Sequence, residues 1–373
     1  MKNKSIISNL TTYIFLLIIF FFFIANLIAK DKPFSEQENR YLQTAPKLSL
    51  KKLASGDFTS EYEKYLSDQF VFRNAWIALK ARSELALGKM QNNDVFNHKQ
   101  MLLCPILDYR EETFRANIDN VKRFAEQNNK VFFALIPNKE TVYSELLPKN
   151  LEPVDMAALI DLAYSESGAR NVEIKETLIE NKSEYIYYNT DHHWTSLGAY
   201  YGSCTLSDQL GLSKKDISSF DRKLVSESFR GTNVSASGFY WYAPDSMEIF
   251  VNENNDITIL NYSTGKAEKS SCYAPEYLEK KDKYKFFFGG NTPLIEIENK
   301  TAQKKSILIV RDSFCDSLLP FLIDEYSYIS VIDLRYFNES LSDYINKHNF
   351  DQILILCGIR TFTEDNNFYK LNQ

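Results

Sequence analysis

The pattern of apolar and polar positions opens with an almost unbroken apolar run. It extends from Tyr13 to Ala29, and Asn26 is its one strongly polar residue. About 17 such residues is the lower limit for a helix that spans a bilayer. The run therefore predicts a transmembrane signal anchor, although Leu27-Ile28-Ala29 would also serve as the cleavage site of a signal peptide. With either outcome we expect the rest of the chain to lie outside the cytoplasm.

The next stretch, from residue 30 to about 104, has helical periodicity. Its large apolar side chains recur at helical intervals, first at Tyr62, Leu66 and Phe70 and then at Trp76, Leu79 and Leu87. Large aromatic side chains dominate cores and helix interfaces. We therefore expect a helical stalk whose aromatic side chains pack against the main domain.

From about residue 105, short apolar runs alternate with helical stretches. The strands expected are 131–136, 185–188, 307–310, 328–332 and 352–356. The helices expected between them are 114–125, 156–163, 197–210, 318–326 and 341–345. This alternation indicates right-handed crossovers and a parallel sheet covered on both faces.

Residues 212 to 305 interrupt the alternation. Short β-like pieces occur there among Ser, Asn and Gly turns, at 247–251, 256–260, 285–288 and 294–297. We interpret this region as a strand-rich insertion that flanks the site.

Composition narrows the class of protein. Hydrophobic residues make up 44% and charged residues 25%, which is typical of a globular chain. The net charge of −6 offers no basic footprint and argues against a nucleic-acid partner.

Candidate catalytic side chains follow the ends of the expected strands. Active sites of parallel α/β sheets form at the carboxyl ends of strands. Three segments end there, at 137–139, 189–193 and 311–314. The architecture therefore places Asp191 and His193 at the same rim as Ser313.

These residue types suit nucleophilic acyl transfer. Ser313 would attack an acyl carbonyl, His193 would take its proton, and Asp191 would hold the imidazole tautomer. An i, i+2 spacing in extended backbone puts Asp191 and His193 on the same side. A helix starting near Ser313 would turn free N–H groups toward the tetrahedral oxyanion.

Two other interpretations remain open. Asp312-Ser313 at a strand end is also a common helix N-cap. Asp191, His192 and His193 could instead bind a metal ion. Adjacent histidines on an extended chain point in opposite directions, which disfavours a shared metal, so we expect none.

The same residues resemble a known family. Asp-His-His-Trp-Thr at 191–195, followed by Leu-Gly-Ala-Tyr-Tyr at 197–201, resembles the signature of the DHHW protein family of Firmicutes. It is similar to the Asp-x-His-Trp-Thr segment of bacterial alginate O-acetyltransferases. The resemblance extends over nearly the whole chain, through Phe-Ser-Glu-Gln-Glu-Asn-Arg at 34–40, Phe-Arg-Gly-Thr at 229–232, Gly-Gly-Asn at 289–291 and Asp-Leu-Arg-Tyr-Phe at 333–337.

The resemblance implies an SGNH hydrolase-like α/β fold, a three-layer parallel sheet with Asp and His before Ser in the chain. The expected organisation is a cytoplasmic tail at 1–12, a transmembrane anchor at 13–29, a juxtamembrane helical stalk at 30–104 and an SGNH-like catalytic domain at 105–373 that contains the insertion at about 212–305.

One departure concerns the nucleophile. The usual Gly-Asp-Ser of the fold is Arg311-Asp312-Ser313 here. Asn291 would replace the family's oxyanion asparagine, although Gly-Gly-Asn-Thr-Pro also has the composition of a plain turn. With Asn138 and Arg311 it completes the residues expected to hold the oxyanion or the substrate.

The resemblance thus implies a membrane-anchored serine O-acyltransferase, expected to transfer acetyl to a cell-envelope or exopolysaccharide glycan. Its implied acyl donor is a polytopic membrane acyltransferase, and no cofactor is expected. An esterase with the same three residues and a non-catalytic envelope binding or assembly protein are the alternatives.

Overall fold

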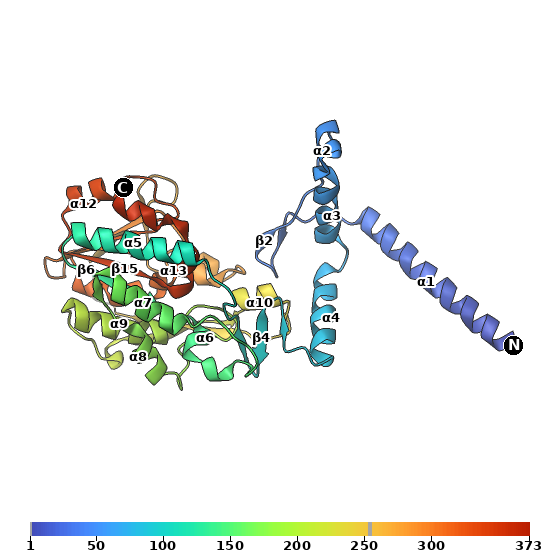
Figure 1. Ribbon diagram of the computed structural model, residues 1–373, viewed down its shortest axis with the longest axis horizontal. Helices are drawn as coiled ribbons and strands as arrows, with labels where there is room; N and C mark the ends of the chain where they lie inside the picture. The colour runs from blue at the N-terminus through green and yellow to red at the C-terminus, as the bar shows by residue number, and fades with distance from the viewer. Residues whose placement is uncertain (1, 253–255) are drawn as a thin grey trace. The chain divides into compact units, whose positions relative to one another are not determined.

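The computed structural model describes residues 2–252 and 256–373, which form two compact units (Figure 1). One contains Met1–Asn92 and Ser235–Trp241, and the other contains Asn93–Val234 and Tyr242–Gln373. The sequence predicted a boundary near residue 104. The difference arises because the hairpin of β4 (Val95–His98) and β5 (Met101–Leu103) belongs to the second unit.

The first unit is mainly helical. Its helix α1 (Lys2–Ile28) includes a stretch, Asn9–Ile28, that is long and apolar enough to cross a membrane by length and composition. The other elements are β1 (Phe34–Ser35), β2 (Arg40–Tyr41), α2 (Leu50–Ser55), α3 (Asp57–Gln69), α4 (Arg73–Ala86) and β3 (Gln91–Asn92).

The second unit is built on an eight-stranded sheet in the order β11-β10-β12-β14-β13-β15-β6-β7. Its strands are β6 (Val131–Ile136), β7 (Arg170–Asn171), β10 (Ile257–Asn261), β11 (Glu268–Ser270), β12 (Leu294–Asn299), β13 (Ser306–Arg311), β14 (Tyr328–Ile332) and β15 (Gln352–Gly358). Strands β14, β13, β15 and β6 pair in parallel, as their β-branched and aromatic runs predicted, and the short strand β7, which the sequence did not predict, pairs in parallel with β6.

Helices cover both faces of this sheet. Strand β6 shows why, since Phe132 and Ala134 enter one apolar cluster while Phe133 and Leu135 enter the other. The first cluster is completed by α8 (Ile174–Glu180), α9 (Ser196–Leu210) and α11 (Phe314–Leu318). The second is completed by α5 (Glu111–Gln127), α7 (Met156–Ser167), α12 (Leu341–His348) and α13 (Ile359–Glu364). The expected three-layer α/β arrangement, with helices on both faces of the sheet, is therefore confirmed.

The insertion is only partly separate from this sheet. Strands β8 (Asp221–Phe229) and β9 (Asp245–Val251) form a two-stranded antiparallel sheet with α10 (Thr232–Ser237) between them. Strands β10, β11 and β12 instead extend the main sheet, and they do so antiparallel. The expected strand at 285–288 is a 3₁₀ turn, Lys283–Phe286.

Two further predictions were wrong. Residues 185–188 form no strand of the sheet, and only an isolated bridge joins Tyr187 to Trp194. The expected helix at 318–326 is divided into the end of α11 and two 3₁₀ turns, Leu319–Phe321 and Ile323–Glu325. Pro320 lacks the N–H that a continuous helix requires.

Candidate active site

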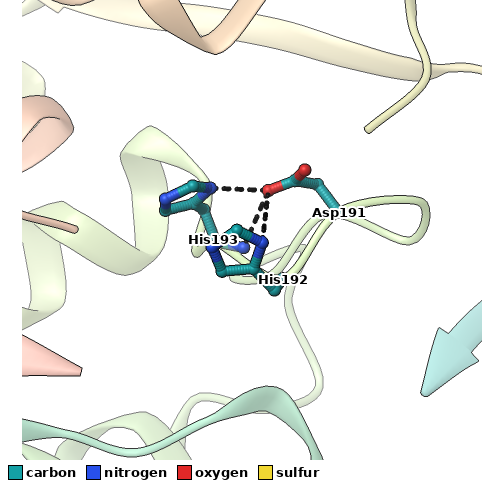
Figure 2. A group of neighbouring side chains, drawn as sticks. All are labelled: Asp191, His192 and His193. Carbon is teal, nitrogen blue, oxygen red and sulfur yellow. Dashed lines mark hydrogen bonds and ion pairs between the residues drawn. The ribbon is translucent and has the colours of Figure 1, made fainter. Parts of the chain in front are cut away.

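Asp191 and His193 lie on a loop, not at a strand end. The loop connects α8 to α9 and is closed by the bridge between Tyr187 and Trp194. It passes through bends, and Thr195 then caps α9 by accepting a hydrogen bond from the Gly198 N–H. The predicted extended backbone around Asp191 is therefore wrong, although its side chain does meet that of His193 (Figure 2).

Ser313 follows β13 directly, at the carboxyl edge where the sequence placed it. The Asp312 carboxylate fixes this turn. It accepts hydrogen bonds from the N–H groups of Phe314 at 3.1 Å and Gly358 at 2.9 Å and from the Thr361 hydroxyl at 2.6 Å. The turn that carries Ser313 is thereby tied to the end of β15 and the start of α13.

A hydrogen-bonded chain joins the two segments. The His193 Nε2 atom lies 2.8 Å from the Ser313 Oγ atom, and its Nδ1 atom lies 2.6 Å from Asp191 Oδ1. Asp191 and His193 are buried, with 2% and 5% of their surface exposed. A serine, an imidazole and a carboxylate linked in this order can activate a nucleophile.

The second carboxylate oxygen of Asp191 is held by the predicted Phe-Arg-Gly-Thr motif. The Thr232 N–H donates to Oδ2 at 2.8 Å and its hydroxyl donates at 3.0 Å. Gly231 is needed beside it, because a Cβ atom there would lie 2.2 Å from the Asp191 Cβ atom. Burial raises the pKa of the Asp191 carboxyl, but His192, His193 and the Thr232 N–H outweigh it and hold the pKa well below its usual range.

Aromatic packing fixes the imidazole of His193. The Tyr284 ring stacks on it with centroids 3.8 Å apart and an angle of 9° between the planes. The Tyr284 hydroxyl pairs with the Ser317 hydroxyl at 3.0 Å, and the Trp194 Nε1–H donates to that same hydroxyl at 2.9 Å. The tryptophan of the DHHW signature therefore ties the histidine loop to α11, which follows the serine.

A buried lysine supports the loop from the other side. Lys139, in α6 (Lys139–Val142), donates from Nζ to the carbonyl oxygens of Tyr188 at 2.9 Å and Asp191 at 2.8 Å, and to Asn189 at 3.4 Å. Its side chain is fully buried, and burial lowers its pKa.

His192 is not a member of the hydrogen-bonded chain from Ser313 to Asp191, but its ring lies beside it. Its Nδ1 atom lies 2.8 Å from the Thr232 hydroxyl, and its ring centroid lies 3.8 Å from that of His193. The prediction that the two imidazoles point in opposite directions is wrong, because the backbone bends there (Figure 2).

Asp191, His192 and His193 offer ligand atoms within 4.8 Å of one another. A metal on His193 would displace its hydrogen bond to Asp191 or to Ser313, because these occupy both ring nitrogens.

The three residues expected to hold oxyanion or substrate are engaged elsewhere. The Asn138 amide donates to Glu140 Oε2 at 2.9 Å. The Asn291 Oδ1 atom accepts from Arg311 at 3.3 Å. It follows Gly289 and Gly290, which have φ of 78° and 95°, as a turn requires.

The Arg311 guanidinium is fully buried and lies 3.2 Å from an oxygen of Asp316 and 3.8 Å from one of Asp333. It therefore supports the strand end through these two ion pairs. Burial raises the pKa of Asp316 to about 7, against the lowering effect of Arg311.

The N–H groups that follow Ser313 were expected to be free, but two of them donate hydrogen bonds within the turn. The Phe314 N–H donates to the Asp312 carboxylate, and the Cys315 N–H donates to the Asp312 carbonyl at 3.2 Å. Among the described residues the Ser313 N–H donates to no acceptor. This N–H is therefore the backbone donor at the nucleophile that remains available for an oxyanion.

Tyr284 and the contacts of Lys139 were missed by the sequence interpretation. Tyr284 lies in the insertion, in a Lys-rich stretch without periodicity. Lys139 was placed at the rim, but a lysine directly after Pro137-Asn138 gives no local sign of burial.

Comparisons with known proteins find a matching family model and similar folds. Residues 151–332 match a family model described as DHHW protein. The fold resembles a DHHW family protein from Eubacterium siraeum with a TM-score of 0.67 and 23% identity, over 76% of this chain and 96% of that chain. A comparison with curated proteins found no match.

Two other solved structures are similar at lower identity. Bacillus cereus PatB1, solved with a sulfonyl adduct, has a TM-score of 0.64 and 18% identity over 74% of this chain and 99% of that chain. The O-acetyltransferase domain of Pseudomonas putida AlgJ has a TM-score of 0.44 and 14% identity over 73% of this chain and 93% of that chain. The resemblance to the DHHW protein family predicted from the sequence is therefore confirmed, by a family match that covers residues 151–332.

Proposed function

We propose that this chain is a membrane-anchored, extracytoplasmic serine O-acyltransferase that transfers acetyl to a hydroxyl of a cell-envelope or exopolysaccharide glycan. The observation that carries the proposal is the hydrogen-bonded chain from Ser313 through His193 to Asp191. The apolar helix α1 supports the anchor.

The reaction has two halves. In the first, Ser313 Oγ attacks the acyl carbonyl while His193 Nε2 takes the hydroxyl proton, and His193 then returns that proton to the leaving group. In the second, a glycan hydroxyl attacks the acyl-serine while His193 takes its proton, and the bond to Ser313 Oγ then breaks as His193 returns that proton to the serine oxygen. The product is an ester of the glycan.

The surrounding residues stabilise the charges that develop. Asp191, kept ionised by its partners, faces the Nδ1–H and stabilises the imidazolium. The Ser313 N–H is positioned to donate to the oxyanion of the tetrahedral intermediate. An esterase would use the same residues with water in place of the glycan hydroxyl.

The test uses the purified full chain in detergent with a small activated acetyl ester. We expect Ser313→Ala and His193→Ala each to lower turnover by on the order of a thousandfold or more while the thermal midpoint is retained. His192→Ala is the matched control, because its ring contacts Thr232 and not Ser313. An essential His192 with a dispensable His193 would contradict the assignment.

A sulfonyl fluoride tests the nucleophile without any assumed substrate. We expect mass spectrometry to find the sulfonyl group on Ser313 in the wild type and not in His193→Ala, because the serine needs the base. A protein that reacts at no serine and turns over no ester would favour the binding or assembly alternative.

Metal dependence separates serine chemistry from metal-assisted hydrolysis. We expect dialysis against a chelator to leave ester turnover unchanged. Turnover that is lost on chelation and restored by a divalent ion would assign Asp191, His192 and His193 to a metal site.

A further inference from the structure

The corner between α3 and α4, residues 70–76, carries aromatic side chains that the proposed reaction does not use. Phe70, Phe72 and Trp76 are 40%, 65% and 42% exposed, and Leu79 continues the same face of α4 at 53%. Phe72, Trp76 and Leu79 have the i, i+4, i+7 spacing of one helical stripe. That the stalk aromatics pack against the main domain stays a prediction, and these four side chains are exposed within their own unit.

Backbone conformation adds to this exposure. Phe72 has a φ of 58°, in the left-handed region that bulky residues rarely adopt. Such a conformation is strained for a bulky residue and persists where the surroundings impose it. Phe72 is thus exposed in a strained backbone conformation. Burial of its ring in an apolar phase would offset the cost of that strain.

The corner contacts the apolar helix α1 directly. The Phe22 ring lies 5.9 Å from that of Phe70 and 5.5 Å from that of Trp76, centroid to centroid. The Asn26 Oδ1 atom accepts from the Val71 N–H at 3.0 Å, and its amide donates to the Phe22 carbonyl at 2.7 Å. Asn26, the one strongly polar residue of the predicted membrane span, therefore connects the corner to α1 by a hydrogen bond.

These contacts fix how deep the corner lies. The apolar stretch of α1 ends at Ile28, and Phe22 precedes that end by six residues. At a rise of about 1.5 Å per residue, Phe22 lies roughly 9 Å inside the end of the stretch. The hydrocarbon half of a bilayer is about 15 Å thick, so side chains beside Phe22 lie within it.

Several polar groups of the corner have hydrogen-bond partners, which lowers the cost of an apolar surrounding. The N–H of Arg73 donates to the Phe70 carbonyl, and those of Ala75 and Trp76 donate to the Phe72 carbonyl. The Arg73 guanidinium pairs with the Glu38 carboxylate.

We propose that residues 70–76 insert into the outer leaflet of the bilayer that α1 spans, with Phe72 and Trp76 among the lipid chains. This inference rests on the membrane anchor in the proposed function. The chain then holds the membrane at two places, the spanning helix and a re-entrant corner tied to it by Asn26. The second contact restricts the rotation of α1 and sets how α3 and α4 lie relative to the lipid.

The test places the full chain in vesicles of phosphatidylcholine and phosphatidylglycerol whose acyl chains carry bromine, which quenches nearby tryptophan. The chain has 3 tryptophans, and Trp194 is fully buried as an internal reference. We expect Trp76 fluorescence, measured as the difference between wild type and Trp76→Phe, to be quenched by the brominated lipid and shielded from aqueous iodide. Equal lipid quenching of both proteins, or a Trp76 that iodide reaches, would overturn the insertion and indicate that protein or water covers the corner.

Asn26→Leu tests the tie, and Asn9→Leu at the far end of the span is its matched control. We expect Asn26→Leu to reduce lipid quenching of Trp76 and Asn9→Leu to leave it unchanged. Equal quenching in all three proteins would contradict the role of Asn26. Extraction with alkaline carbonate checks the anchor separately, since a chain released from the vesicles would overturn the anchor itself, whereas ester turnover reports on Ser313 independently.

Discussion

At the scale of single residues, two buried charges meet at the turn that carries His193. The Asp191 carboxylate is enclosed by donors from His193 and Thr232, while its carbonyl oxygen accepts from the Lys139 ammonium. Buried charges are tolerated when their hydrogen bonds are satisfied. Lys139 therefore acts as a positioning residue, since it contacts the backbone of the loop and not the reacting atoms.

We predict that Lys139→Met retains the fold but lowers ester turnover. The change leaves three carbonyl oxygens without their donor, which costs about 1–3 kcal/mol, and a shift of His193 by about 1 Å would lower kcat on the order of a hundredfold. Lys175→Met is the matched control, because Lys175 is also buried but pairs with Asp161 at 2.7 Å in a different part of the unit. A loss of stability in both variants with turnover kept in Lys139→Met would show a purely structural role.

A second prediction concerns pH. Burial raises the pKa of Asp316 to about 7, above the roughly 3.9 of an unfolded chain. The folded protein thus holds this proton more tightly, so the contribution to stability is full below about pH 4 and is lost as the pH rises through about 7. The slope is at most about 1.4 kcal/mol per pH unit.

Asp316→Asn removes this titration. We expect its stability, relative to wild type, to rise as the pH is raised from 5 to 8, measured by thermal midpoints across that range. Asp208→Asn, at an exposed carboxylate, should show no such trend. A relative stability of Asp316→Asn that stays constant over the same range would mean that the ion pair with Arg311 keeps Asp316 ionised.

At the scale of elements, the histidine loop has no regular structure of its own and is fixed by its neighbours. The buried Asp245 carboxylate, on β9, accepts from the N–H groups of Asn189 at 2.9 Å and Thr190 at 2.8 Å. Trp194 ties the loop to α11, and Gly231 and Thr232 cover Asp191. The insertion therefore contributes to the site by holding this loop.

We predict that Gly231→Ala disrupts the site through a steric clash with Asp191. Its Cβ atom would lie 2.2 Å from Asp191 Oδ2, so one of the two must move. Turnover should fall on the order of a hundredfold. Gly211→Ala is the control, because it has a φ of 66° and nothing within 4 Å, so it should cost about 1–2 kcal/mol of stability and leave turnover unchanged. Equal turnover in the two variants would contradict the role of the Asp191 contact.

At the scale of the whole molecule, the proposed anchor decides which acyl donors are accessible. An outward-facing unit has no access to cytoplasmic acetyl-CoA, and the sequence shows neither a nucleotide-binding glycine fingerprint nor a pyrophosphate motif. We propose a polytopic membrane acyltransferase as the donor. Held beside it by α1, the chain would meet its donor at high effective concentration.

We predict that the purified chain cannot use acetyl-CoA but accepts a small activated acetyl ester. Mass spectrometry should find acetyl on Ser313 after the ester and not after acetyl-CoA, with Ser313→Ala unlabelled by either. Efficient transfer from acetyl-CoA by the chain alone would contradict the proposed donor.

The sequence by itself determined β6, β13, β14 and β15, the covering helices α5, α7, α9 and α12, and the apolar helix, because each depends on a local pattern that burial imposes. It also singled out Asp191, His193 and Ser313, because rare reactive residues at the ends of apolar runs are informative. The antiparallel pairing of β10 to β12 and the loop conformation at 185–193 were not predictable, since both depend on partners distant in sequence.

Only the tertiary structure decided which side chains surround the candidate nucleophile. Arg311 follows an apolar strand and was expected to face a substrate, but Asp316 and Asp333 enclose it. Tyr284 and Lys139 carried no periodic signal, yet one stacks on His193 and the other holds its loop. Burial of a polar side chain depends on the three-dimensional arrangement of partners that satisfy it, and a local sequence pattern does not contain that arrangement.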